Sequence, residues 1–158
     1  MQSDKVVFYF QEHLLKLIPD DIRDKVAFAG GCVRDKLLDV EIKDYDIFVD
    51  SKETEDKLMA FLKKAGKGGK INTQTANYTF NGKWIQVVRG KYYNINSSDI
   101  IDSFDFTICQ AMITTKGLQT TPRFWKAVAT KHLEVSVLHF PLSSLERMVK
   151  YIKKGYTP

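Results

Sequence analysis

The 158-residue sequence has few cysteine and histidine residues, which form the disulfides and metal sites that stabilise small scaffolds. Its two cysteines, Cys32 and Cys109, form no CxxC motif and have no histidine nearby. This excludes a disulfide scaffold and a structural zinc site, and we expect both thiols to be reduced core residues. The three histidines, His13, His132 and His139, stand apart, which does not favour a catalytic triad or a histidine metal cluster.

Long apolar segments are also missing. No run approaches the roughly 20 residues that a bilayer span requires, and the N-terminal segment lacks the order of a signal peptide. We therefore expect a cytoplasmic protein with no membrane partner. Because 44% of the 158 residues are hydrophobic, the chain can bury a sizeable core, and we expect a single domain over residues 1–158.

The net charge is +5, but the charged residues are distributed unevenly along the sequence. Residues 1–62 carry 9 basic and 14 acidic side chains, whereas residues 63–158 carry 15 basic and 5 acidic ones. A basic surface can attract phosphate-bearing partners, but many basic surfaces are merely solvated. We therefore assign no site role to the lysines that fit either interpretation: Lys63, Lys64, Lys67, Lys70, Lys150, Lys153 and Lys154.

The spacing of apolar residues predicts an alternation of helices and strands. Helices are predicted over 4–17, 32–39, 52–64 and 141–154 and from Pro122 onward, and strands over 25–29, 45–49, 75–80, 83–88 and 104–113. Asn81-Gly82 is a strong hairpin signal. The segment 66–70, GKGGK, lacks the spacing of a phosphate-binding P-loop, so we expect a mobile basic connector.

The residues best suited to chemistry are aspartates near predicted strands. Asp44 and Asp46, at the start of the strand 45–49, are expected to share a face because side chains at i and i+2 do so. Two carboxylates that share a cation suit Mg²⁺, and a third from a neighbouring strand would allow two ions. Asp105 is the candidate, because a carboxylate buried on a strand must be paired or bind a metal.

A glycine pair precedes these aspartates. Gly30-Gly31 lies between a predicted strand and a predicted helix, where backbone amides can approach a triphosphate closely. Arg34, one turn into that helix, could add a contact to the phosphates. An ion pair between Arg34 and a neighbouring carboxylate is an equally good interpretation.

The segment 30–49, GGCVRDKLLDVEIKDYDIFV, resembles the head-domain signature of bacterial-type CCA-adding enzymes and poly(A) polymerases, members of the DNA polymerase β-like nucleotidyltransferase superfamily. The segment 105–111, DFTICQA, is similar to a second motif of that family, and 141–156 is similar to the first helix of its neck. The resemblance implies an α+β fold with a small mixed sheet, helices on one side, and C-terminal helices resembling the start of a neck. A catalytic core of about 20–120 would precede a helical part of about 121–158.

The resemblance also implies roles for individual residues. Gly30 and Gly31 would hold the triphosphate of an NTP such as ATP, and Asp44 and Asp46 would bind the catalytic metals, two Mg²⁺ ions or alternatively Mn²⁺. Where the family has two arginines before its DFT motif, this chain has Ser103 and Phe104.

The third carboxylate of the resembled site also has no direct counterpart. The nearest equivalent on the preceding strand is Gln86. Asp105 is therefore either the third metal ligand, which we favour, or a contact to the nucleotide.

These features predict a metal-dependent nucleotidyltransferase that moves a nucleoside monophosphate from an NTP to an acceptor hydroxyl, with an RNA 3′ end as the favoured acceptor. A protein or small-molecule hydroxyl is the alternative acceptor, and a non-catalytic nucleotide-binding or RNA-binding module is the alternative function. The resemblance does not extend to the tRNA-measuring body and tail of the family. We therefore expect a minimal transferase encoded by a virus or a mobile element, acting in the host cytoplasm if a virus encodes it, or one that works with a partner protein for acceptor recognition.

Overall fold

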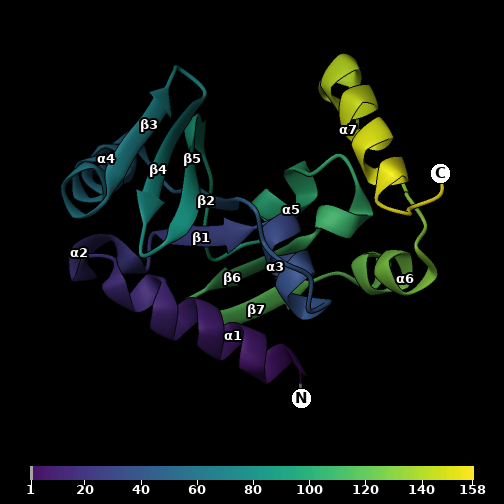
Figure 1. The fold of residues 1–158 in the computed structure, drawn as a ribbon, viewed down its shortest axis with the longest axis horizontal. Helices are drawn as coiled ribbons and strands as arrows, with labels where there is room; N and C mark the ends of the chain where they lie inside the picture. The colour runs from purple at the N-terminus through teal and green to yellow at the C-terminus, as the bar shows by residue number, and fades with distance from the viewer. Residues whose placement is uncertain (1) are drawn as a thin grey trace.

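The computed structural model describes residues 2–158, over which seven α-helices pack around a seven-stranded mixed sheet (Figure 1). The helices are α1 (Gln2–His13), α2 (Asp20–Arg23), α3 (Gly31–Leu37), α4 (Lys52–Ala65), α5 (Asp99–Ser103), α6 (Pro122–Thr130) and α7 (Pro141–Lys153), with 3-10 turns η1 (Leu15–Leu17) and η2 (Thr107–Cys109). The strands are β1 (Val26–Ala29), β2 (Tyr45–Val49), β3 (Lys67–Ile71), β4 (Thr75–Phe80), β5 (Lys83–Tyr92), β6 (Ala111–Thr114) and β7 (Gly117–Thr120). Over these residues, none of the helices combines the length and hydropathy that crossing a bilayer requires.

The strand order across the sheet is β3-β4-β5-β2-β1-β6-β7. β2 pairs in parallel with β5, and the other neighbouring strands of the described chain pair antiparallel. The first residues of β2 therefore lie near the middle of the sheet, between the antiparallel strands β3 to β5 on one side and β1, β6 and β7 on the other.

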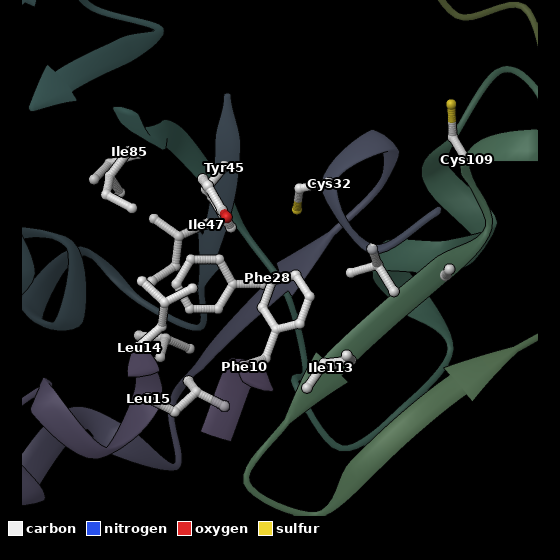
Figure 2. Close-up of a cluster of buried hydrophobic side chains, with 14 of the residues drawn as sticks. Phe10, Leu14, Leu15, Phe28, Cys32, Tyr45, Ile47, Ile85, Cys109 and Ile113 are labelled. Carbon is white, nitrogen blue, oxygen red and sulfur yellow. The ribbon is translucent and has the colours of Figure 1, made fainter. Parts of the chain in front are cut away.

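One face of the sheet packs against α1, α3 and α4 and forms the main core. Because strand side chains alternate between faces, β2 directs Tyr45, Ile47 and Val49 into this core. Figure 2 shows Phe10 of α1 beside Phe28 of β1, with ring centroids 5.5 Å apart. Burial of these apolar side chains from α1, β1 and β2 holds the centre of the sheet in place.

The opposite face of the sheet is covered only in part. Ile101 of α5 packs there with Phe48 of β2 and Met112 of β6 in a second, smaller apolar cluster. Over β5 the same face remains open, because Gln86 is half-buried and Trp84 is exposed. The helices thus lie mainly on one side of the sheet, as the resemblance implies, with α5 on the other.

Most of the predicted elements are confirmed. The predicted helices correspond to α1, α3, α4, α6 and α7, and the predicted strands to β1, β2, β4 and β5. Asn81 and Gly82 both have positive φ, 50° and 73°, as the expected two-residue hairpin turn requires.

The mobile connector expected over 66–70 is wrong, because Lys67–Ile71 form the edge strand β3. Lys67 pairs with Thr79 of β4. Gly66 permits this approach, since a Cβ atom at that position would overlap the carbonyl oxygen of Thr79. The glycines of this segment therefore serve a close backbone contact and an edge strand.

The strand predicted over 104–113 is wrong in its first half. Phe104 ends α5, η2 follows, and the strand β6 begins only at residue 111. The backbone at Asp105 is held by the segment after α6, because the amide of Ser136 donates to the carbonyl oxygen of Asp105 at 2.7 Å. Asp105 therefore does not lie on a strand of the sheet.

Candidate functional site

Two carboxylates stand at the start of β2. Tyr45 lies between them and points into the core, where its hydroxyl forms a 2.5 Å hydrogen bond with the hydroxyl of Tyr9. Asp44 and Asp46 therefore lie on the other side of the strand, with Asp44 exposed and Asp46 half-buried. The i and i+2 spacing brings this predicted pair together, as expected.

The pair is electrostatically unfavourable in the absence of a cation. Burial raises the pKa of Asp46 to about 6, and the neighbouring charge of Asp44 raises it as well. Arg147 and Lys150 of α7 act in the opposite direction, so both cations lie close enough to influence Asp46. A carboxylate pair faced by two cations can bind a divalent cation and an anionic ligand together.

The glycine turn between β1 and α3 adjoins these carboxylates. Gly30 has φ +85° and its amide donates to the carbonyl oxygen of Ala111 at 2.9 Å, so this amide is used within the fold. Gly31 is the first residue of α3, where amides have no carbonyl partner within the helix. The Cys32 thiol lies against the backbone of Asp46, which puts the start of α3 beside β2. Of the two glycines, Gly31 has the amide that could meet a phosphate.

Arg34 is buried and already paired. Its Nε atom lies 3.0 Å from Oδ1 of Asp35, and its guanidinium lies 5.1 Å from the ring centroid of Tyr151 in α7. Its side chain is only 3% exposed. The ion pair, one of the two roles open at the level of the sequence, is therefore the one observed, and Arg34 fastens α7 to α3.

Asp105 is held by α7. Its Oδ2 atom accepts a hydrogen bond from the Ser144 hydroxyl at 2.9 Å and lies 3.2 Å from Nη1 of Arg147. Its Oδ1 atom is buried and has no hydrogen-bond partner among the described residues. One oxygen is thus used to dock α7, and the other is an acceptor without a donor.

The structure does not gather three carboxylates. Within residues 2–158 no group of three or more His, Cys, Asp or Glu side chains is arranged to hold a metal. Gln86 of β5 pairs with Asp46 in the parallel register, so an amide is the nearest side chain on the neighbouring strand. Asp44 and Asp46 are brought together, whereas Asp105 is tied to Ser144 instead.

Sequence reasoning missed Arg147. This residue lies in the segment that resembles a neck helix, but its contact with Asp105 and its effect on the pKa of Asp46 depend on how α7 packs. Lys150, about one turn later, is one of the lysines to which the sequence alone assigns no site role. Burial and the charges of Lys150, Arg34 and Lys43 lower the pKa of Lys154, which shows that cations from α3, α7 and the segment before β2 gather near the end of α7. The amphipathic pattern of the helix was the available signal, and it does not reveal which face meets the carboxylates.

The fold is that of known nucleotidyltransferases. The chain is similar to a CCA-adding enzyme in an apo form, with 22% identity and a TM-score of 0.67 over 94% of this chain and 39% of that chain. It is similar to a CCA-adding enzyme in complex with ATP, with 24% identity and a TM-score of 0.66 over 94% of this chain and 38% of that one. The Thermotoga maritima CCA-adding enzyme complexed with tRNA gives 22% identity and a TM-score of 0.67 over 95% and 39%.

The chain spans about two fifths of the length of these enzymes. The α+β nucleotidyltransferase-like fold expected from the resemblance is therefore confirmed, whereas membership of the CCA-adding family is not. A comparison with curated proteins gives no match. The family model that matches, over residues 5–131, is that of Gad2, described as Gabija anti-defense 2 family protein.

Proposed function

The chain belongs to the Gabija anti-defense 2 family, and we propose that it is a metal-dependent nucleotidyltransferase. In the proposed reaction an acceptor hydroxyl attacks the α-phosphorus of an NTP. A new oxygen–phosphorus bond forms, the bond between the α-phosphorus and the bridging oxygen breaks, and pyrophosphate leaves with that oxygen. The observation that carries the proposal is the Asp44 and Asp46 pair at the start of β2, faced by Arg147 and Lys150.

The basic side chains, the backbone and the acidic side chains have different roles in the proposed reaction. Arg147 and Lys150 would offset the negative charge of the triphosphate, and the amide of Gly31 would donate to a phosphate oxygen. The proton that the acceptor hydroxyl loses would pass to solvent water, because Asp44 and Asp46 are the proposed ligands of the ion.

The donor set fits Mg²⁺, with Mn²⁺ as the alternative occupant. Asp44 and Asp46 provide oxygen ligands alone, and Mg²⁺ typically binds one or two carboxylates and completes its shell with water and substrate phosphates. Bound there, the ion would supply Lewis-acid stabilisation of phosphate charge. The pair accounts for one ion, and a second would require a further ligand such as the unpartnered Oδ1 atom of Asp105.

An RNA 3′ end is the proposed acceptor. Support comes from the fold, because one similar enzyme is complexed with tRNA and another with ATP. The family description supports a role for the reaction in countering the Gabija defence. A protein hydroxyl is the other acceptor compatible with the same site.

Transfer of label tests this function. The protein is incubated with Mg²⁺, each α-³²P-labelled NTP in turn, and either RNA or a protein extract. Label should appear on the acceptor with wild-type protein and with Asp20→Asn, a control whose carboxylate side chain is 91% exposed. It should be lost with Asp44→Asn and with Asp46→Asn. Label transfer that persists in both site variants would contradict the proposed mechanism.

A second candidate is a non-catalytic nucleotide-binding or RNA-binding module. The observation in its favour is that Asp105 is engaged by Ser144 and Arg147 and does not complete a three-carboxylate group. Calorimetric titration with an NTP, with and without Mg²⁺, separates the two. Binding that needs neither the metal nor Asp44 and Asp46, without label transfer, would favour the module.

A further inference from the structure

The strands β3, β4 and β5 leave one face of the sheet uncovered. α4 packs against their other face and lies behind β3 and β4 in Figure 1. On the open face the register aligns Lys67 of β3, Thr79 of β4 and Trp84 of β5 in one row. Trp84 is 55% exposed, so its indole ring is available to a ligand.

This row leads to the carboxylates of β2. Gln86 pairs with Asp46 in the parallel register, and cross-strand partners point to the same face of a sheet. Trp84 comes one residue before Ile85, which pairs with Tyr45 at the start of β2, so the indole lies on the same face as Gln86 and near the end of β2 that Asp44 precedes. The exposed indole and Asp46 therefore lie on one face of two adjacent strands.

The surroundings are strongly basic. Residues 63–98 carry seven basic side chains and no acidic one. Lys63, Lys64, Lys67 and Lys70 are exposed at the end of α4 and along β3, and none takes part in an ion pair within residues 2–158. The strands β3, β4 and β5 themselves therefore place no carboxylate in the path of an anionic chain that crosses the β3 edge toward β2.

We propose that this open face binds single-stranded nucleic acid, with a base stacked on Trp84 and phosphates held by Lys67 and the β3 edge. The strand end then lies at Asp44 and Asp46, so this inference rests on the proposed function and identifies its acceptor platform. A single strand is required because a duplex keeps its base faces covered, whereas an unpaired base can stack on an aromatic ring.

Intrinsic fluorescence reports directly on the proposed contact. The sequence has two tryptophans, so Trp125→Phe leaves Trp84 as the only one. This variant is titrated with 12-nucleotide oligouridylate and oligodeoxythymidylate, in EDTA and without NTP. Saturable quenching is expected. A difference between the two oligomers would assign a contribution to the 2′-hydroxyl, and equal binding would assign recognition to stacking and phosphates alone.

Substitution of the indole measures its contribution. In anisotropy titrations with labelled oligomer, Trp84→Ala should weaken binding by about 5- to 150-fold, the range typical of one stacked base. Trp84→Phe keeps an aromatic face and should lose less, and circular dichroism establishes that both variants are folded. Trp125→Phe should bind as wild type does.

Salt dependence tests the lysines. Replacing Lys63, Lys64, Lys67 and Lys70 by Gln should reduce the slope of log K against log salt by up to about 3, at about 0.7 per phosphate for single strands. Lys116→Gln is the matched control, since this exposed lysine lies in the turn between β6 and β7 at the opposite edge of the sheet.

Three results would overturn the inference: binding without quenching of Trp84, a duplex that competes as well as the single strand, or polyglutamate that does so. These measurements need neither metal nor NTP, so Asp46→Asn should still bind oligomer. Wild-type protein that binds but never transfers label contradicts the proposed function alone. Label transfer with an unchanged acceptor KM in Trp84→Ala contradicts the acceptor platform alone.

Discussion

Replacing Asp46 by Asn should stabilise the metal-free protein at neutral pH. In the folded state burial and the charge of Asp44 raise the pKa of Asp46 from 3.8 to about 6. At 1.36 kcal/mol per unit this corresponds to about 3 kcal/mol, which the partial exposure of the side chain reduces to about 1–3 kcal/mol. The neutral amide of the variant avoids this cost.

The sign of the pH dependence follows from the raised pKa. Between about pH 4 and pH 6 the folded wild-type protein binds more protons at Asp46 than the unfolded chain does, so its stability falls as pH rises through this window. Below pH 4 wild type and Asp46→Asn should be similarly stable. Above pH 6 the variant should be more stable by about 1–3 kcal/mol.

Urea unfolding in EDTA at pH 4 and pH 7.5 measures the difference. For a chain of this size the gain corresponds to a rise in Tm of about 2–10 °C at pH 7.5. Mg²⁺ should reduce the difference in stability between the variant and wild type, because it binds the folded wild-type site and not the variant. An equal effect at both pH values, or a less stable variant at pH 7.5 without metal, would refute the reasoning.

Three further predictions concern the surrounding framework. Gly30→Ala should destabilise the fold by about 1–3 kcal/mol in urea unfolding, because its φ of +85° is costly for a residue with a Cβ atom. Arg34→Met should cost about 1–3 kcal/mol in urea unfolding by leaving Asp35 unpaired. Arg147→Ala should move the titration of the Asp46 carboxyl, followed by ¹³C NMR, to higher pH because a compensating charge is lost, and Arg147→Lys should largely restore it. A Gly30→Ala or Arg34→Met variant as stable as wild type, or an unmoved titration, would each contradict the corresponding argument.

Local pattern was sufficient where the structure follows from neighbours in the sequence. The pairing of Asp44 with Asp46 on one face depends only on the two-residue period of a strand. The turn at Asn81-Gly82 follows from residues that tolerate positive φ. The helical spacing of α4 similarly anticipates the side that meets the sheet, since Leu58 and Leu62 are both buried.

Local pattern failed where distant segments compete for the backbone. Asp105 between two phenylalanines has the alternation of a strand, but its carbonyl oxygen accepts a hydrogen bond from Ser136, which follows α6. The glycines and lysines of 66–70 resemble a connector, yet the close approach of Gly66 to Thr79 makes the following residues an edge strand. In both cases a partner outside the local window decides the conformation.

The sequence by itself determined the carboxylate pair, the glycine turn beside it and most of the helices and strands, because these depend on side-chain periodicity and local backbone preference. Only the tertiary structure decided the roles of the cations. Arg34 is enclosed and Arg147 reaches the site because α7, more than one hundred residues beyond α3, packs over it through Tyr151. Whether a charged side chain is buried in an ion pair or faces a ligand depends on long-range packing. The spacing of residues along the chain does not determine that packing.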